Sequence, residues 1–322
     1  MRLIMLGTGP FAVPTLQALA ASRHDVSLVV TRPAQGRTPT ASPLQRAAEQ
    51  LNLAVWSPTT INAPESQSRL ASLAPDLLVV CDYGEILRAE TLAAARLGGI
   101  NLHGSLLPKY RGAAPVQWAI LRGETETGNS VIHMTPGLDA GPILAQQRTA
   151  IDPDEDAAQL EERLATMGAN LVLQAIDALE SGTAKPIPQD ASHASKAPRL
   201  KKEQGAIDWN RPAQEIKNQV RALRPWPRAY TFWHRPNAAP LRLNIDRVAV
   251  FSPPPTAGVA SATPHSAAQP GSVLESTTRL LIATADAPLE ILDLQPAGKR
   301  SMPAPDFLRG YRVQIGDLFA PA

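Results

Sequence analysis

The N-terminal half of the chain alternates short apolar runs with segments of helical period. The runs RLIML, VSLVV and DLLVV are separated by helix-forming segments near residues 14–22 and 43–51. This alternation predicts βαβ units, whose parallel strands form a sheet with helices on both faces. After three further apolar runs, a long helix is expected over about 156–179, ended by Ser181-Gly182. We therefore predict an α/β fold with a Rossmann-like, mostly parallel sheet in a first domain, residues 1–183.

A change of composition marks a second domain. Residues 184–204 are rich in Pro, Ala, Ser and Lys and lack an apolar period, which predicts a surface linker. A helix expected over 213–222 then precedes the short strand-like runs AYTFW, LRLNIDRVAV, RLLIAT and LEILDL. Such runs predict a smaller C-terminal β-barrel, OB-like, over residues 205–322. The Pro-rich segment 252–271 is expected to be a mobile loop.

Charge is distributed unevenly between the two parts. The chain has 31 Lys and Arg and 29 Asp and Glu, yet from Lys196 onward there are 17 basic and 10 acidic residues. A basic module joined to an acidic one suits a polyanion-binding domain on a catalytic domain, although ordinary surface variation gives the same asymmetry. No apolar segment approaches the roughly 20 residues of a membrane-spanning helix, and no secretion signal opens the chain. We expect a cytoplasmic protein without membrane contact, with the single Cys81 buried as a small hydrophobe.

A glycine pattern follows the first expected strand. Gly7-x-Gly9-x-x-Ala12 has the position of a dinucleotide-binding turn. The second strand ends in Thr31-Arg32 instead of an acidic residue, which would favour NADP. The same glycines suit any tight strand-to-helix turn, and Pro10 and Pro14 crowd the helix start where amides would hold a pyrophosphate. An NADP-dependent oxidoreductase is thus an alternative built on these residues.

Polar residues end a later strand. Asn101 and His103 lie two residues apart, so they share one face at the carboxyl edge of the expected sheet, where open α/β sheets bind ligands. An Asn donates to an oxyanion and a His exchanges protons near neutral pH, although both also serve as turn and capping residues. Asp139 lies in a loop rich in Gly and Pro. If that loop folds over the sheet edge, its carboxylate can pair with His103 as the third group of an acyl-transfer site.

The remaining histidines lack metal-ligand spacing, so we predict no metal. Ser105 has no G-x-S-x-G setting, which disfavours a serine hydrolase.

At these residues the sequence resembles the methionyl-tRNA formyltransferase family, and the resemblance extends over nearly the whole chain. Its most specific stretch is Asn-Leu-His-Gly-Ser-Leu-Leu-Pro at residues 101–108, whereas the early glycines are unspecific. The other matching segments are residues 7–12, 82–87, 110–117, 138–141, 200–203, 207–209, 224–227 and 295–299.

The resemblance implies a formyl transfer that supports translation initiation. The α-amine of methionyl initiator tRNA attacks the formyl carbon of 10-formyltetrahydrofolate, and the family's glycine turn holds no dinucleotide. Asn101 and protonated His103 then stabilise the tetrahedral oxyanion, while Asp139 supports His103 and helps to move a proton from the amine to the folate nitrogen. The residues implied to line the folate site are Ser105, Leu106, Leu107 and Pro108. We expect a monomer.

The resemblance also gives the basic C-terminal part a partner, because the barrel then helps to hold tRNA. Between Lys196 and Val250, 12 basic residues accompany 4 acidic ones. Trp209, Trp226, Tyr230 and Trp233 lie among them, but a barrel core is the first interpretation for the tryptophans. The residues expected to contact tRNA are Arg32, Arg37, Lys201, Lys202, Arg224 and Lys299.

Two features depart from the family. The loop 31–42 is short, with only Arg32 and Arg37 as basic residues, where family members commonly carry a longer basic loop that reaches the tRNA acceptor end. Asp82 takes a position before Tyr-Gly that is usually small and apolar. Besides the oxidoreductase, two alternatives stay open: a transferase of the same chemistry acting on an amino sugar or another small amine, and an RNA-binding protein with an inactive catalytic fold.

Overall fold

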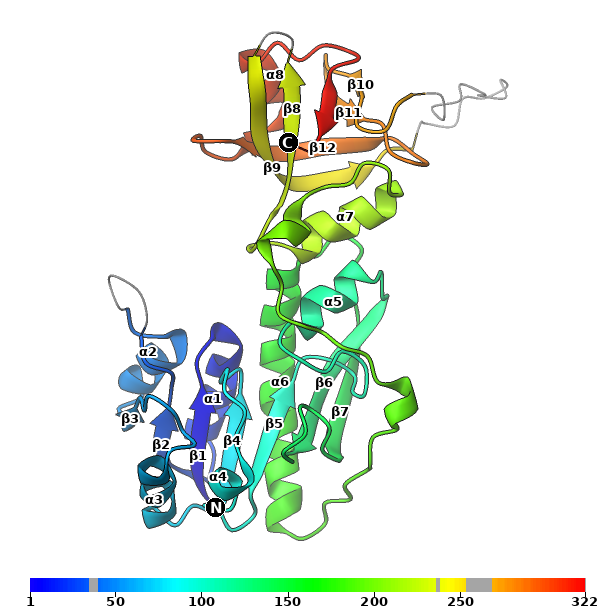
Figure 1. Cartoon of the computed structure of the whole chain (residues 1–322). Coiled ribbons are helices and arrows are strands. Elements are labelled where there is room, and N and C mark those ends of the chain that lie inside the picture. Colours follow the sequence, from blue (N-terminus) through cyan, green and yellow to red (C-terminus); the bar gives the residue numbers. More distant parts are fainter. Residues whose placement is uncertain (35–39, 236–237, 253–267, 322) are drawn as a thin grey trace. The chain divides into compact units, whose positions relative to one another are not determined.

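The structure is a computed structural model that describes residues 1–34, 40–235, 238–252 and 268–321. The chain divides into two compact units (Figure 1). The first unit comprises residues 1–119, 125–152 and 159–199, and the second comprises residues 120–124, 153–158 and 200–322. Most of the expected mobile loop, residues 253–267, and the expected tRNA contact Arg37 lie outside the described residues.

The first unit is built on one seven-stranded sheet with the order β3-β2-β1-β4-β5-β6-β7. The pairs from β3 to β5 are parallel, and β6 and β7 are added antiparallel. The fold class predicted from the sequence is therefore confirmed for this unit. The strands are β1 (Arg2–Gly7), β2 (Asp25–Val30), β3 (Val55–Trp56), β4 (Leu77–Cys81), β5 (Gly99–His103), β6 (Glu126–His133) and β7 (Ile143–Ala150).

Helices cover both faces of this sheet. The segments expected near 14–22, 43–51 and 156–179 are α-helical, and α2 begins where the Ser42 side chain accepts a hydrogen bond from the Gln45 amide, with Pro43 in the first turn. The helical elements are η1 (Pro10–Ala12), α1 (Val13–Ala20), α2 (Pro43–Gln50), α3 (Pro64–Ser72), α4 (Ala89–Leu92), α5 (Pro115–Leu121) and α6 (Ala157–Glu180).

Two cores hold the helices to the sheet. Side chains alternate along β1, so Leu3 and Met5 join one core with α1, α2 and α6, while Ile4 and Leu6 join the other with α3 and α4. Burial on both faces explains why β4 is a continuous apolar run, which includes the fully buried Cys81. No helix in the part of the chain that the structure describes is long and apolar enough to cross a membrane.

The second unit is an antiparallel sheet with the order β10-β11-β12-β9-β8-β14, and β13 pairs with β12. A bridge between Ser272 and Leu318 joins the first strand of this order to the last, so the sheet nearly closes into the expected barrel. The elements are α7 (Ala213–Ala222), β8 (Ala229–Arg235), β9 (Ala238–Val250), β10 (Val273–Glu275), β11 (Leu280–Ile282), β12 (Leu289–Pro296), β13 (Met302–Pro303), α8 (Ala304–Gly310) and β14 (Leu318–Ala320).

The tryptophans of this unit divide into two kinds. Trp209 and Trp233 are buried in the barrel core, where Trp209 lies edge-on to Phe319 and Trp233 edge-on to Phe307. Trp226 has 50% of its surface exposed. Trp209 and Trp233 are therefore core residues, whereas Trp226 is accessible to solvent.

Residues 184–199, which belong to the linker expected over 184–204, are mostly exposed and are bonded to the first unit. Ile187 and Ile143 exchange two backbone hydrogen bonds, and the Ala197 amide donates to the Arg111 carbonyl at 2.7 Å. Such single bridges leave no periodic pattern, which is why the sequence did not reveal them.

Candidate active site

The strand β5 ends with Asn101 and His103, which lie at the carboxyl edge of the sheet beside β4. The Asn101 amide Nδ2 donates to Oδ1 of Asp139 at 3.4 Å, and His103 Nδ1 lies 3.7 Å from Oδ2 of the same carboxylate. The side chains of His103 and Asp139 are both largely buried. The fold thus brings together the three residues that the sequence singled out as catalytic.

Asp139 is held in an unusual backbone conformation. Its φ angle is +47°, in the left-handed region that non-glycine residues seldom occupy. The Gly112 amide donates to Oδ2 of its carboxylate at 2.9 Å. The carboxylate therefore accepts hydrogen bonds from two different segments, and this fixes it opposite the imidazole.

The hydrogen bond at Nε2 fixes the tautomer of His103. Nε2 lies 2.9 Å from the carbonyl oxygen of Tyr110, and because a carbonyl oxygen can only accept, Nε2 carries the hydrogen. Nδ1 is then the nitrogen without a hydrogen in the neutral ring, and it is the one that faces Asp139.

These groups line a cavity of about 440 Å³. Asn101, His103 and Asp139 contribute to its wall together with the segment after β4 and the start of η1. The volume falls in the range that small-molecule sites occupy. The lining residues to which the sequence assigned no place in the site include Pro10, Phe11, Tyr83, Gly84, Glu85, Ile86, Leu138, Glu161 and Arg199.

Asp82 lines the same cavity and meets the glycine turn. A Cβ on Gly9 would lie 1.9 Å from Oδ2 of Asp82, and the Gly9 amide donates to this carboxylate. Loss of hydration and then the charge of Glu161 raise the pKa of Asp82 to about 6, against the opposing effect of the Gly9 amide. A carboxylate thus lies where a dinucleotide would place its pyrophosphate, which argues against the NADP-dependent alternative.

The loop after β4 is anchored by Glu85. Its carboxylate accepts hydrogen bonds from Asn62 Nδ2 at 2.9 Å and from the hydroxyl of Thr60, and it pairs with Arg32 at 2.5 Å. Arg32, expected to contact tRNA, is therefore engaged inside the first unit. Its ion pair holds the cavity-lining loop in place.

The predicted folate residues lie beside the cavity and are absent from its described lining. Ser105 is fully buried and its hydroxyl donates to the Lys109 carbonyl at 2.7 Å. The Leu107 amide donates to Ser130 Oγ at 3.0 Å, and Gln146 donates to the Leu107 carbonyl at 2.8 Å. Leu106 and Pro108 are half-buried. In the structure this stretch supports the turn that follows His103.

The expected tRNA contacts of the second unit are at its surface. Lys201, Lys202 and Lys299 are exposed. Arg224 is partly exposed and lies 3.5 Å from a carboxylate oxygen of Asp156.

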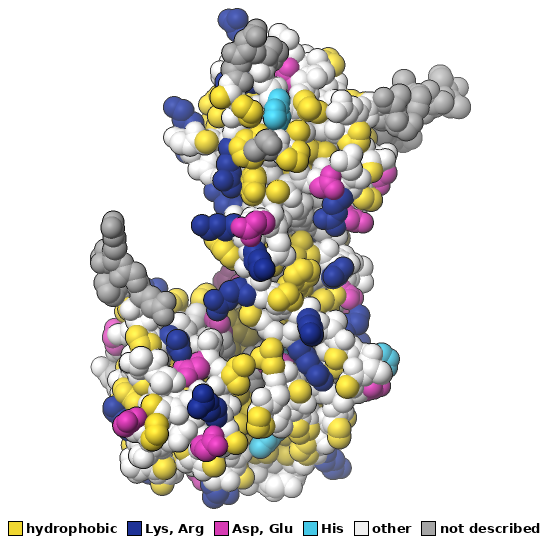
Figure 2. Space-filling model, in the orientation of Figure 1, with side chains coloured by type: hydrophobic (Ala, Val, Ile, Leu, Met, Phe, Trp, Pro, Cys, Tyr) yellow, Lys and Arg dark blue, Asp and Glu magenta, His cyan; other side chains and the backbone are white. Residues whose placement is uncertain are grey.

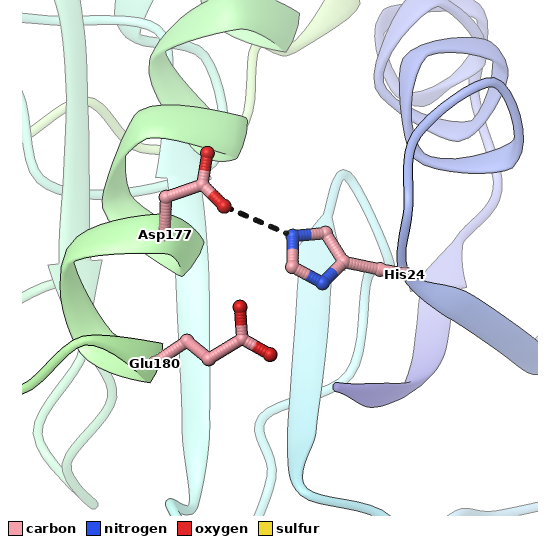
Figure 3. A group of neighbouring side chains, drawn as sticks. All are labelled: His24, Asp177 and Glu180. Atoms are coloured by element: carbon pink, nitrogen blue, oxygen red, sulfur yellow. Dashed lines mark ion pairs between the residues drawn. The ribbon is translucent and has the colours of Figure 1, made fainter.

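Outside this site, one group of side chains in the described residues has the composition and spacing of metal ligands. His24, just before β2, faces Asp177 and Glu180 of α6, as Figure 3 shows, with His24 Nε2 3.3 Å from Asp177. Arg23 already pairs with both carboxylates, at 2.7 and 2.5 Å. The group is thus accounted for as an ion-pair cluster that joins the start of β2 to α6.

Two family models match the chain. The model described as Formyl transferase matches residues 1–176, and the model described as Formyl transferase, C-terminal domain matches residues 199–312. Together with a Rossmann-like sheet whose edge carries an Asn and a His, faced by an Asp from a neighbouring loop, these matches define the class as formyl transferases.

Curated relatives narrow this class. A methionyl-tRNA formyltransferase of Solibacter usitatus is 43% identical over 317 residues, covering 97% of this chain and 96% of the relative. A methionyl-tRNA formyltransferase of Rhodopirellula baltica is 43% identical over 339 residues, covering 100% of this chain and 97% of the relative. The chain belongs to the methionyl-tRNA formyltransferase family.

Solved structures share the fold. WlaRD, a sugar 3N-formyl transferase crystallised in the presence of dTDP and 5-N-formyl-THF, has a TM-score of 0.64 at 18% identity and covers 93% of this chain and 99% of its own. An N-formyltransferase from Helicobacter canadensis, in complex with folinic acid and dTDP-3-aminofucose, has a TM-score of 0.65 at 18% identity, with coverages of 90% and 98%. At these identities the likeness extends to the fold alone.

Proposed function

We propose that this enzyme transfers the formyl group of 10-formyltetrahydrofolate to the α-amine of methionyl initiator tRNA. The observation that carries the proposal is the convergence of Asn101, His103 and Asp139 on one cavity. Family membership supports the acceptor, since the full-length relatives are named methionyl-tRNA formyltransferase, and the folates crystallised with structural neighbours support the donor. The reaction belongs to translation initiation, and we place the enzyme in the cytoplasm as a monomer.

The side chains suit each step of such a transfer. The neutral amine attacks the formyl carbon, and the negative charge that develops on the formyl oxygen is met by Asn101 Nδ2 and a proton on His103 Nδ1. The amine nitrogen then loses a proton and the bond from carbon to the folate nitrogen breaks as that nitrogen is protonated. Asp139 accepts a hydrogen bond from Asn101 and faces His103 Nδ1 at 3.7 Å, so it orients both donors and assists this proton movement.

The donor folate has two candidate surfaces. Ser105 to Pro108 remain the residues that family resemblance assigns to it. The cavity wall formed by Tyr83 to Ile86, together with Leu138, offers the apolar faces and backbone groups that a flat heterocycle needs. Ile86 and Leu138 are both largely exposed. We propose that the heterocycle enters this cavity while Ser105 to Pro108 shape the turn behind His103.

The second unit is proposed to hold the tRNA. Its surface lysines, Lys201, Lys202 and Lys299, suit contacts to phosphates, and Lys and Arg side chains recur along the face shown in Figure 2. Arg224 lies two residues before the exposed Trp226 in the sequence, so a cation and an aromatic face are both available in this segment. Binding through phosphates would weaken steeply as salt rises.

The deciding experiment is transfer of labelled formyl from 10-formyltetrahydrofolate to methionyl initiator tRNA. We expect product with the wild-type enzyme, and none with His103→Ala or with uncharged tRNA. Turnover of an amino sugar or another small amine without transfer to tRNA would instead support the small-amine alternative. Binding of tRNA without any turnover would support the inactive-fold alternative.

A further inference from the structure

Gln189 joins the catalytic loop to the segment after His103. It belongs to residues 184–199, which pack on the first unit, and its side chain is half-buried. Its amide Nε2 donates to the carbonyl oxygens of Asp139 at 2.8 Å and Gly141 at 2.7 Å. Its Oε1 accepts from Arg111 Nε at 3.1 Å and Nη2 at 2.7 Å. An amide offers two donor hydrogens and two acceptor lone pairs, so these four bonds use its full capacity.

Asp139 is the residue that needs such support. Its φ of +47° costs roughly 1–2 kcal/mol, and its loop from Thr135 to Gly141 contains two glycines and a proline. A strained backbone persists only where its surroundings hold it. Gln189 fixes the carbonyl of Asp139 itself and that of Gly141 two residues later, and so holds the backbone from which the Asp139 carboxylate projects.

The other end of the link is equally well placed. Arg111 precedes Gly112, whose amide donates to Oδ2 of Asp139 at 2.9 Å. The same dipeptide thus holds the backbone of Asp139 through Gln189 and the carboxylate of Asp139 directly. Arg111 is itself fixed by backbone bonds to Ser195 and Ala197, at 2.9 and 2.7 Å.

We propose that Gln189 is a positioning residue for formyl transfer, which aims the carboxylate of Asp139 at Asn101 and His103. The inference rests on the proposed function, because it assigns Asp139 a part in the reaction. Gln189 acts through the loop and touches neither substrate. A displacement of about 1 Å in such a group lowers rates by about 100-fold.

Two substitutions at Gln189 test its hydrogen bonds to the loop carbonyls and to Arg111. Gln189→Ala removes all four bonds. Gln189→Glu keeps acceptors for Arg111 but sets a carboxylate oxygen against the carbonyls of Asp139 and Gly141. We expect both to lower kcat about 10- to 100-fold while KM for folate and tRNA stays within about 2-fold. The matched control is Asp190→Ala, which loses its hydrogen bonds to Ser192 and its pairing with His193 in the same segment and should keep wild-type kcat.

A double-mutant cycle distinguishes positioning from general loosening. In an Asp139→Asn background, Gln189→Ala should lower kcat by less than about 3-fold, since the group it aims is already impaired. An equal loss in both backgrounds would overturn the proposal, as would a Gln189→Ala enzyme with wild-type kcat.

Amide hydrogen exchange tests the link without any turnover. We expect residues 137–141 to exchange faster in Gln189→Ala than in the wild type and in Asp190→Ala. Unchanged exchange would overturn the positioning role whatever the enzyme's reaction proves to be. A wild-type enzyme that fails to formylate methionyl-tRNA would instead reject the proposed function.

Discussion

Nδ1 of His103 and Oδ2 of Asp139 lie 3.7 Å apart, which is longer than a hydrogen bond, while Nε2 of the same ring is held at 2.9 Å by the Tyr110 carbonyl. The imidazole is thus anchored at one nitrogen and open at the other. Catalytic contacts often tighten only when substrate is bound. The open nitrogen is the one that we propose meets the formyl oxygen.

Asn101 is the neutral hydrogen-bond donor beside His103, and its removal should slow the reaction strongly. Asn101→Ala is expected to lower kcat about 100- to 1,000-fold, because one of two donors to the developing oxyanion is lost. KM for the tRNA should change little, and initial rates at saturating substrates measure the effect. A loss below about 10-fold would show that Asn101 is no oxyanion donor.

The glycine that holds Asp139 should tolerate no side chain. Gly112 has a φ of +129°, and a Cβ there would lie 2.5 Å from the Ala197 carbonyl oxygen. Gly112→Ala should therefore lower the free energy of unfolding by roughly 2–4 kcal/mol and reduce kcat. Gly182→Ala is the control, since φ is +70° there and nothing lies within 4 Å of the new Cβ. It should cost about 1 kcal/mol and leave kcat unchanged; equal losses in denaturant titrations would refute the steric argument.

The stability contribution of Asp82 should depend on pH. Its pKa in the folded state is about 6, above the ordinary value of 3.8, so the folded protein binds this proton more tightly than the unfolded chain. The contribution of this proton to the free energy of unfolding is fully present below pH 3.8 and is lost as the pH rises through about 6. Asp82→Asn should raise the free energy of unfolding at pH 8 by on the order of 1 kcal/mol, a value reduced because water reaches the carboxyl group from the cavity.

Thermal unfolding of wild type and Asp82→Asn at pH 4 and pH 8 checks this sign. The advantage of the variant should disappear at the lower pH. A constant difference at both values would mean that the group does not titrate as described.

The exposed tryptophan should contribute to tRNA binding. Trp226→Ala is expected to weaken tRNA affinity roughly 5- to 100-fold, the effect of losing one stacked base, with little change in Tm. Ile315, also exposed in the second unit, provides the apolar control Ile315→Ala. Filter binding or fluorescence titration at fixed salt measures both; equal effects of the two variants would argue against stacking.

Much of the fold could be predicted because periodic patterns report burial. The parallel sheet and the long helix α6 follow from apolar runs and a 3.6-residue period, and the barrel follows from its short strands. The attachment of residues 184–199 to the first unit could not be predicted, because these residues make single backbone bridges and side-chain hydrogen bonds, which leave no periodic pattern in the sequence. The antiparallel direction of β6 and β7 could not be predicted either, because it depends on which strands pair, and no local sequence pattern encodes that.

The candidate active site could be predicted from sequence patterns only in part. Two residues on one strand face, Asn101 and His103, follow from alternation alone. Their approach to Asp139 depends on a loop with a left-handed residue, which the sequence cannot orient. Asp82 is the sharpest case: no pattern in the sequence assigns it a role, whereas the structure shows its carboxyl group on Gly9.

The bonds between residues 184–199 and the catalytic loop determine how the protein can be dissected. A fragment ending at 183 would contain every residue of the catalytic set and all seven strands of the first sheet, but it would lack Gln189 and the Ala197 bond to Arg111. An isolated catalytic domain, or a fusion that replaces the barrel, should therefore keep the chain through Arg199.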